Sequence, residues 1–224
     1  MLGVTSTAEA LCDSLYQHTG YSPDAPPTAI PIAKACFGPD FIRLVPKTWG
    51  RRGHPGISAA RIDTESGEVR VLLPRGMHPR RAHWQVSYRV ARWWMRRNGY
   101  VFGCGAESAE ADSISEILAA AIVAPRRAFL ASLLRHDGDL AALARAWCLE
   151  ESSIALRIAE ATRQVDAAVV DRDHVRVRLA IGRLPEDEGE LRRLVALPVL
   201  PRGFVRVRLA DDPTRVAMLA GRAA

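Results

Sequence analysis

The chain has 224 residues, of which 48% are hydrophobic and 25% charged, and this balance excludes a wholly disordered protein. The net charge of +6 comes almost wholly from arginine, because Lys34 and Lys47 are the only lysines. It permits an acidic partner or nucleic acid but specifies neither. No apolar run approaches the roughly 18–20 residues that cross a bilayer, and residues 1–20 lack the pattern of a secretion signal, so we expect a cytoplasmic protein.

Helical and strand-like patterns alternate in the first half of the chain. Leu11 and Leu15 have the i, i+4 spacing of a short amphipathic helix, and Pro125 ends the longest apolar stripe. In chain order the patterns predict helices at 8–17 and 30–37, a strand at 41–45, a β-hairpin of 57–63 and 69–73, and helices at 79–98 and 107–124.

The second half begins with helices and ends with strands. Helices are predicted at 125–134, 139–147 and 152–165, and the short link between the last two indicates a helix–turn–helix. Valine and arginine then alternate at 174–179 and again at 205–210, which is the period of a half-buried strand. An acidic loop at 186–188 separates these repeats, so we expect a small β-rich appendage.

Three short stretches resemble the ImmA/IrrE zinc peptidase family, in the order expected for it. Residues 85–93 align without gaps with a family helix that reads like T-L-A-H-E-L-G-H-W. Residues 115–125 match the spacing of A-N-x-F-A-A-x-L-L-M-P, with Asp112 where an acidic ligand is expected. The helix–turn–helix, through residues such as Leu143, Trp147 and Arg157, resembles the module that follows.

The resemblance implies an α+β fold with a zincin-like mini-domain of short helices, a small antiparallel sheet, a motif helix and a long helix. The expected domains are a peptidase-like domain at 1–135, a helix–turn–helix extension packed on it at 136–168, and a β-rich region at 169–224.

The zinc motif of the family is absent from this chain. An HExxH places two histidine ligands on one helix face and a water-activating glutamate between them. In the aligned register these positions hold Tyr88, Arg92 and Arg89, and a guanidinium stays protonated and repels a cation. A register that starts at His83 fares no better, because it puts Ser87 at the second ligand position. No two of the six histidines are four residues apart, so we expect no cofactor and no zinc.

Two hypotheses describe the degenerate zinc position. In the first, Arg92 and Asp112 form a buried ion pair near Tyr88 that replaces the metal as a structural tie, and removing one partner costs about 3–5 kcal/mol. In the second, Arg89, Arg92 and Arg96 bind an anion such as an acidic peptide or a phosphate group.

The remaining arginines offer a second surface. The second helix of the helix–turn–helix begins with Glu150 and Glu151, which disfavours contact with DNA. The strand repeats predict a basic sheet face and a further anion-binding candidate, composed of Arg176, Arg178, Arg206 and Arg208. Like charges directly opposite each other destabilise paired strands, so these strands are not neighbours or an anion compensates.

These features favour a catalytically inactive member of the family with a regulatory or protein-binding role. The resemblance implies a transcriptional repressor or an antitoxin as partner. One alternative is an active zinc peptidase with atypical ligands that cleaves a repressor. Another is a nucleic-acid-binding regulator that uses the basic C-terminal sheet. The four cysteines lack CxxC spacing, so reduced, buried thiols are expected.

Overall fold

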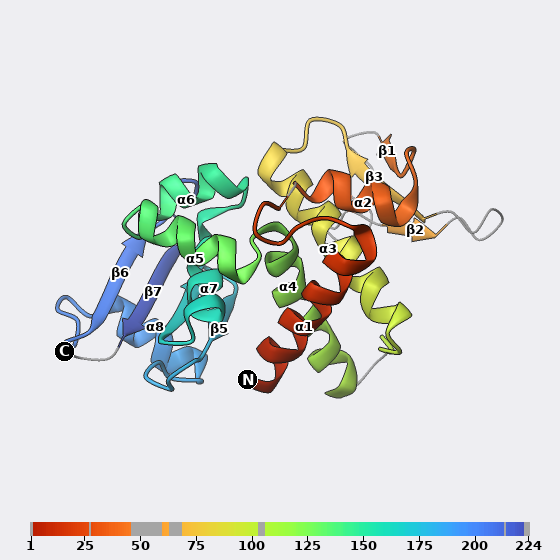
Figure 1. The fold of residues 1–224 in the computed structure, drawn as a ribbon. Coiled ribbons are helices and arrows are strands. Elements are labelled where there is room, and N and C mark those ends of the chain that lie inside the picture. The colour runs from red at the N-terminus through yellow and green to blue at the C-terminus, as the bar shows by residue number, and fades with distance from the viewer. Residues whose placement is uncertain are drawn as a thin grey trace. The chain divides into compact units, whose positions relative to one another are not determined.

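The computed structural model describes residues 2–26, 28–45, 60–62, 69–102, 106–212 and 214–221. Its contacts divide the chain into two compact units, shown as a ribbon in Figure 1. The first unit comprises Thr7–Ala128, and the second comprises Met1–Ser6 together with Phe129–Ala224. The helices beyond Phe129 therefore belong to the same unit as the C-terminal strands.

The first unit joins helices to a three-stranded sheet. Its helices are α1 (Leu2–Thr19), which begins in the second unit, α2 (Ala29–Phe37), α3 (Pro79–Arg97) and α4 (Ala106–Val123). Its strands are β1 (Ile42–Val45), β2 (Ala60–Ile62) and β3 (Val69–Pro74), in the order β1-β3-β2.

The pairing of these strands confirms the hairpin and corrects the sheet. β2 and β3 are antiparallel, with Ala60 opposite Val71, as the hairpin pattern predicted. β1 lies parallel to β3, with Ile42 opposite Val71, so the small sheet is mixed and the expectation of an antiparallel sheet was wrong. A parallel neighbour requires a long crossover, and the chain between β1 and β3 supplies one.

Three long helices form the core of the first unit, and hydrogen bonds from buried side chains join them. The indole N–H of Trp94 on α3 donates to the carbonyl of Leu11 on α1 at 3.0 Å. The hydroxyl of Tyr16 on α1 donates to the carbonyl of Ile122 on α4 at 2.8 Å, and burial raises the pKa of this phenol. Each bond satisfies a buried polar group between two helices.

The second unit is a four-stranded antiparallel sheet with helices against it. The strands are β4 (Val165–Val170), β5 (Val175–Arg178), β6 (Phe204–Arg208) and β7 (Val216–Gly221), in the order β5-β4-β7-β6. The helices are α5 (Arg126–Arg135), which begins in the first unit, α6 (Leu140–Trp147), α7 (Glu151–Thr162) and α8 (Glu188–Ala196).

Helices α7 and α8 pack against opposite faces of this sheet. Ala168 of β4 and Met218 of β7 lie opposite each other in register and share a buried cluster with Leu191 of α8. The neighbouring residue in β4, Ala167, pairs with Arg178, whose side chain bonds to Glu160 of α7. Because successive residues of a strand face opposite sides, the sheet is the middle layer of the unit.

The α+β class is confirmed, and three elements of the second unit were not predicted. Both alternating repeats are strands, but they form β5 and β6 at the two edges of the sheet. The strands between them, β4 and β7, were missed, as was helix α8 after the acidic loop.

Among the described residues no single helix is long and apolar enough to cross a bilayer, although α4 and α5 taken together pass the same test of length and composition.

Candidate functional site

Helix α3 places the residues of the degenerate zinc position on one side. Pro79 starts the helix, where a missing N–H costs nothing, and Asn98 ends it. Tyr88 and Arg92 are one turn apart, so their side chains are neighbours on the helix surface. Next to Tyr88, the hydroxyl of Ser87 donates to the carbonyl of Ala119 on α4 at 2.6 Å and brings the two helices close together.

The structure brings Arg92 and Asp112 together as predicted. The guanidinium Nη1 lies 3.1 Å from Oδ1 of Asp112 and 3.3 Å from the hydroxyl of Tyr88, to which it donates. Its planar group also lies 4.0 Å from the ring centre of Phe102, a contact that the sequence gave no reason to expect. The cation therefore has a carboxylate, a hydroxyl and an aromatic face as partners.

The pair is less buried than the first hypothesis assumed. The side chain of Arg92 is 25% exposed and that of Asp112 is 49% exposed. Water therefore screens the two charges, and the 3–5 kcal/mol expected for a buried pair is an overestimate.

Three arginines of α3 form a cluster of like charge, which we call the arginine cluster: Arg89, Arg92 and Arg96. The guanidinium of Arg96 lies 5.5 Å from the ring centre of Phe102, and that of Arg89 lies 5.8 Å from the ring centre of Tyr88. Burial lowers the pKa of Arg89, and the charges of Arg92 and Arg96 lower it further. A site with this charge attracts anions and repels metal cations.

His83, where the alternative zinc motif would begin, has a structural role instead. His83 is buried, and its Nε2 accepts the backbone N–H of Ala29 at 2.7 Å. Ala29 is the first residue of α2, whose N-cap residue makes no side-chain capping bond, so the imidazole caps that helix. Within the described part of the chain, no three His, Cys, Asp or Glu side chains are grouped as metal ligands would be.

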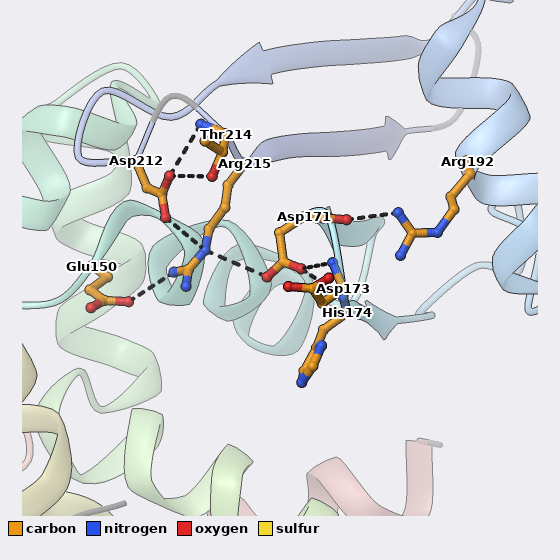
Figure 2. A network of polar contacts seen from close by, with 8 residues as sticks. All are labelled: Glu150, Asp171, Asp173, His174, Arg192, Asp212, Thr214 and Arg215. Atoms are coloured by element: carbon orange, nitrogen blue, oxygen red, sulfur yellow. Dashed lines mark hydrogen bonds and ion pairs between the residues drawn. The ribbon is translucent and has the colours of Figure 1, made fainter. Parts of the chain in front are cut away.

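A second polar constellation lies at one end of the sheet in the second unit (Figure 2). The guanidinium of Arg215 is central to it: Nη1 lies 3.3 Å from Glu150, and Nε lies 3.1 Å from Asp212 and 3.6 Å from Asp171. Glu150 belongs to the turn before α7, Asp171 to the β4–β5 turn and Asp212 to the β6–β7 turn. One cation thus ties three connections together.

The carboxylates around Arg215 are also held by their own turns. Asp171 accepts the N–H groups of Asp173 and His174, and Asp212 accepts the hydroxyl of Thr214 at 2.6 Å. Burial works against the ionised form of Asp171, but the two N–H groups and Arg215 prevail, and its pKa is lowered. The bond from Thr214 lowers the pKa of Asp212. Both acids are therefore negatively charged partners for Arg215 at neutral pH.

The first turn of α7 is hydrogen-bonded to the β6–β7 turn. The N–H of Glu151 donates to Asp211 at 2.8 Å, and the carboxylate of Glu151 accepts the N–H of Ala210 at 2.6 Å. A DNA-reading helix presents basic or polar side chains at this end. In this structure the first turn instead carries a buried glutamate bonded to the β6–β7 turn.

The predicted basic face of the sheet does not exist. Arg178 pairs in register with Ala167 and faces α7, where its Nε lies 2.9 Å from the carboxylate of Glu160. Arg206 pairs with Met218 and faces α8, where it donates to the carbonyl of Leu197 at 2.8 Å. Arg176 shares the face of Arg178, and Arg208 shares that of Arg206. The two repeats lie at opposite edges of the sheet. Their registers with β4 and β7 place the arginines of one repeat on the α7 face and those of the other on the α8 face.

Glu160 also contacts a buried cation on its own helix. Arg157 has no exposed surface, and its Nη1 lies 3.6 Å from the Glu160 carboxylate. A pocket of about 10 Å³ adjoins Glu160 and Arg163, which is room for about one water molecule. This space is too small for a peptide or a nucleotide.

Asp166 is a polar residue of β4 that the sequence did not single out. Its buried carboxylate accepts backbone N–H groups from the segment after β5, those of Ala180, Ile181, Gly182, Arg183 and Leu184. Burial opposes ionisation, but the N–H bonds outweigh it, and the pKa of Asp166 lies below its ordinary value. The residue therefore holds the loop after β5 in place.

Comparisons with known proteins give a fold but no family. No protein-family model matches the chain, and no curated protein matches it. Among solved structures, a Mycobacterium tuberculosis transcriptional regulator matches with a TM-score of 0.61 and 12% sequence identity. The match covers 100% of this chain and 89% of the other. At this identity it shows a shared fold alone.

Proposed function

We propose that the chain is a non-catalytic regulatory protein on a metallopeptidase-like scaffold, which binds a protein partner through the arginine cluster of α3. The observation that carries the proposal is the contact of 3.1 Å between Arg92 and Asp112. Both residues occupy positions where the resemblance expects zinc ligands, and the cation of Arg92 takes the place of the metal. A transcriptional repressor or an antitoxin is the partner class that the resemblance implies.

Two further points support a regulatory role. The similar solved structure from Mycobacterium tuberculosis is named a transcriptional regulator. The start of α7 is bonded to the β6–β7 turn through Glu151, so contact with a protein agrees with the structure better than insertion of this helix into DNA.

The absence of a catalytic metal is tested first. The full chain, purified without chelator, should contain far less than stoichiometric zinc by mass spectrometry and should leave a panel of repressors and antitoxins uncleaved. Stoichiometric zinc that is lost in Asp112→Ala, together with cleavage of a panel member, would establish the active peptidase instead.

Partner binding is tested with matched charge variants. Replacing two arginines of the cluster, in Arg89→Gln/Arg96→Gln, should weaken binding to a cognate panel member by at least about tenfold, because charge-assisted hydrogen bonds are worth about 1.5–3 kcal/mol each. Arg43→Gln/Arg75→Gln removes the same charge from exposed positions of the same unit and should change little. Equal losses in both double variants would show that net charge, and not the cluster, governs binding.

A further inference from the structure

The outer edge of β6 carries backbone groups that have no partner among the described residues. Gly221 donates to Gly203, and Leu209 donates to Arg215, which identifies residues 203 and 209 as members of hydrogen-bonded pairs with β7. In an antiparallel ladder such pairs alternate along the strand, so 205 and 207 also bond to β7. The N–H and C=O groups of Arg206 and Arg208 therefore point away from β7, and among the described strands β7 is the only neighbour of β6.

The side chains of this edge are accessible. Val205 is 54% exposed, and Arg206 and Arg208 are exposed as well. The two arginines lie on the α8 face, while Val205 and Val207 lie on the other face, beyond the strands that α7 contacts. The edge thus offers a row of backbone groups with positive charge on one side and an apolar surface on the other. Figure 1 shows β6 next to β7 at the end of the sheet.

The charges argue against pairing of this edge with the β6 edge of a second copy of the chain. Antiparallel pairing of β6 with itself about Arg206 places that residue opposite its own copy. Pairing about Val207 places Arg206 opposite Arg208 twice, and pairing about Arg208 places Arg208 opposite itself. Like charges directly opposite each other destabilise a strand pair, and edge charges of this kind prevent self-association.

We propose that the edge of β6 is a docking site for an extended acidic segment of a partner protein, which adds to the sheet as a further strand. Acidic side chains at alternate positions of the segment lie opposite Arg206 and Arg208, where opposite charges stabilise cross-strand pairs. Apolar side chains at the positions between them meet Val205 and Val207. Backbone bonds supply affinity, and the alternation supplies specificity. Nucleic acid would use the charge but neither the backbone groups nor the valines.

The site shares no residue with the arginine cluster of α3, so the two proposals can be tested independently. Substitutions in the cluster should leave strand addition unchanged, and substitutions in β6 should leave binding at the cluster unchanged.

The test uses the full chain and a dye-labelled nine-residue peptide of alternating valine and aspartate. Binding is followed by fluorescence anisotropy, and amide exchange is followed at Arg206 and Arg208. The peptide should bind and slow exchange at both amides. Absence of binding, or binding without this protection, overturns the proposal. A DNA duplex that binds as tightly and gives the same protection also overturns it.

Charge variants separate local from overall electrostatics. Among the described residues no hydrogen bond or ion pair involves the Arg208 side chain, whereas Arg206 caps α8, so Arg208→Glu is the cleaner reversal. It should weaken binding of the valine–aspartate peptide at least about tenfold. It should strengthen binding of the corresponding valine–lysine peptide. Arg135→Glu, on an exposed position of α5, makes the same change in net charge and should have little effect. Equal losses in the two variants contradict the proposal.

A backbone variant tests strand addition directly. Proline at position 208 removes an N–H that the β6–β7 ladder does not use, and edge strands tolerate proline at such positions. Arg208→Pro should therefore bind the peptide more weakly than Arg208→Ala, which removes the same charge and keeps the N–H. Equal binding by these two variants shows that the backbone edge is not used and overturns the proposal.

Discussion

Arg92 combines weak contacts of different kinds, and its contribution to stability follows from their exposure. The ion pair with Asp112 is partly exposed and contributes about 0.2–1 kcal/mol, and the stacking on Phe102 adds about 0.5–1 kcal/mol. We expect Arg92→Ala to lower the free energy of unfolding by about 1–2 kcal/mol in urea titrations. Arg75→Ala, on an exposed position of the same unit, should change it by less than about 0.5 kcal/mol. A loss above about 3 kcal/mol would restore the buried-pair hypothesis.

Asp166 makes the second unit sensitive to acid. Its pKa is lowered in the folded state, so its contribution is present above the ordinary aspartate pKa of about 3.9 and is lost as the pH falls through the lower folded value. Asp171 and Asp212 act in the same direction. Asp166→Asn should cost about 2–4 kcal/mol at pH 7, since it leaves N–H groups of the 180–184 loop without acceptors.

Amide exchange checks this prediction where the bonds are made. In Asp166→Asn the amides of Ile181 and Leu184 should exchange faster at pH 7. Stability should also depend less on pH below about 4 than in the parent chain. If stability depends on pH below about 4 in the same way in Asp166→Asn and in the parent chain, the Asp166 carboxyl has its ordinary pKa in the folded protein.

Cys36 is a half-buried thiol that should react slowly. Burial raises its pKa to about 12, and the charge of Arg97 offsets only part of that increase. Because the thiolate is the reactive form, alkylation by iodoacetamide at pH 8 should be far slower than for a model cysteine peptide. Labelling of Cys36 at the rate of that peptide would contradict the buried environment. Cys12 is buried as expected, whereas Cys36 and Cys148 are partly exposed, and Cys104 lies outside the described residues.

At the scale of elements, Arg215 determines how three connections of the second unit are held together. Replacement by glutamine keeps a similar length but leaves Glu150, Asp171 and Asp212 close to one another without a cation. We expect Arg215→Gln to lower the free energy of unfolding by about 1–3 kcal/mol and to speed amide exchange in the β4–β5 and β6–β7 turns. Arg215→Lys should restore part of the loss, because it keeps the charge but offers only one nitrogen. If exchange is unchanged in both variants, the network does not stabilise the turns.

Elements with a clear period were predictable, and fully buried ones were not. Strands β5 and β6 alternate along one half-buried surface, so their pattern shows in the sequence. Strand β4 is buried on both faces between β5 and β7, and its sequence Val-Asp-Ala-Ala-Val-Val has no alternation. Helix α8 did carry a signal: Asp187 caps it by accepting the N–H of Glu190, with leucines one turn apart behind. Reading 186–188 only as a charged loop missed that signal.

For the molecule as a whole, local patterns predicted the helices of the first unit, and the family resemblance implied the meeting of Arg92 with Asp112. The helical period determines which residues share a face, and the alignment with the family's ligand positions indicated which two helices would meet. The network of Arg215 and the loop around Asp166 could not be predicted in this way. They join residues from different turns, whose proximity depends on strand order, and strand order depends on the unrecognised β4 and β7.

The reciprocal bonds between Glu151 and residues 210 and 211 have a consequence for how the second unit folds. They span 59 and 60 positions of the chain, so the first turn of α7 obtains its acceptor and its donor only after most of the unit has been assembled. Contacts so distant in sequence require loop closure before they stabilise anything, and proteins rich in them fold slowly. A fragment that ends before β6 should therefore leave α7 frayed, and the helix–turn–helix is not expected to be an autonomous folding module.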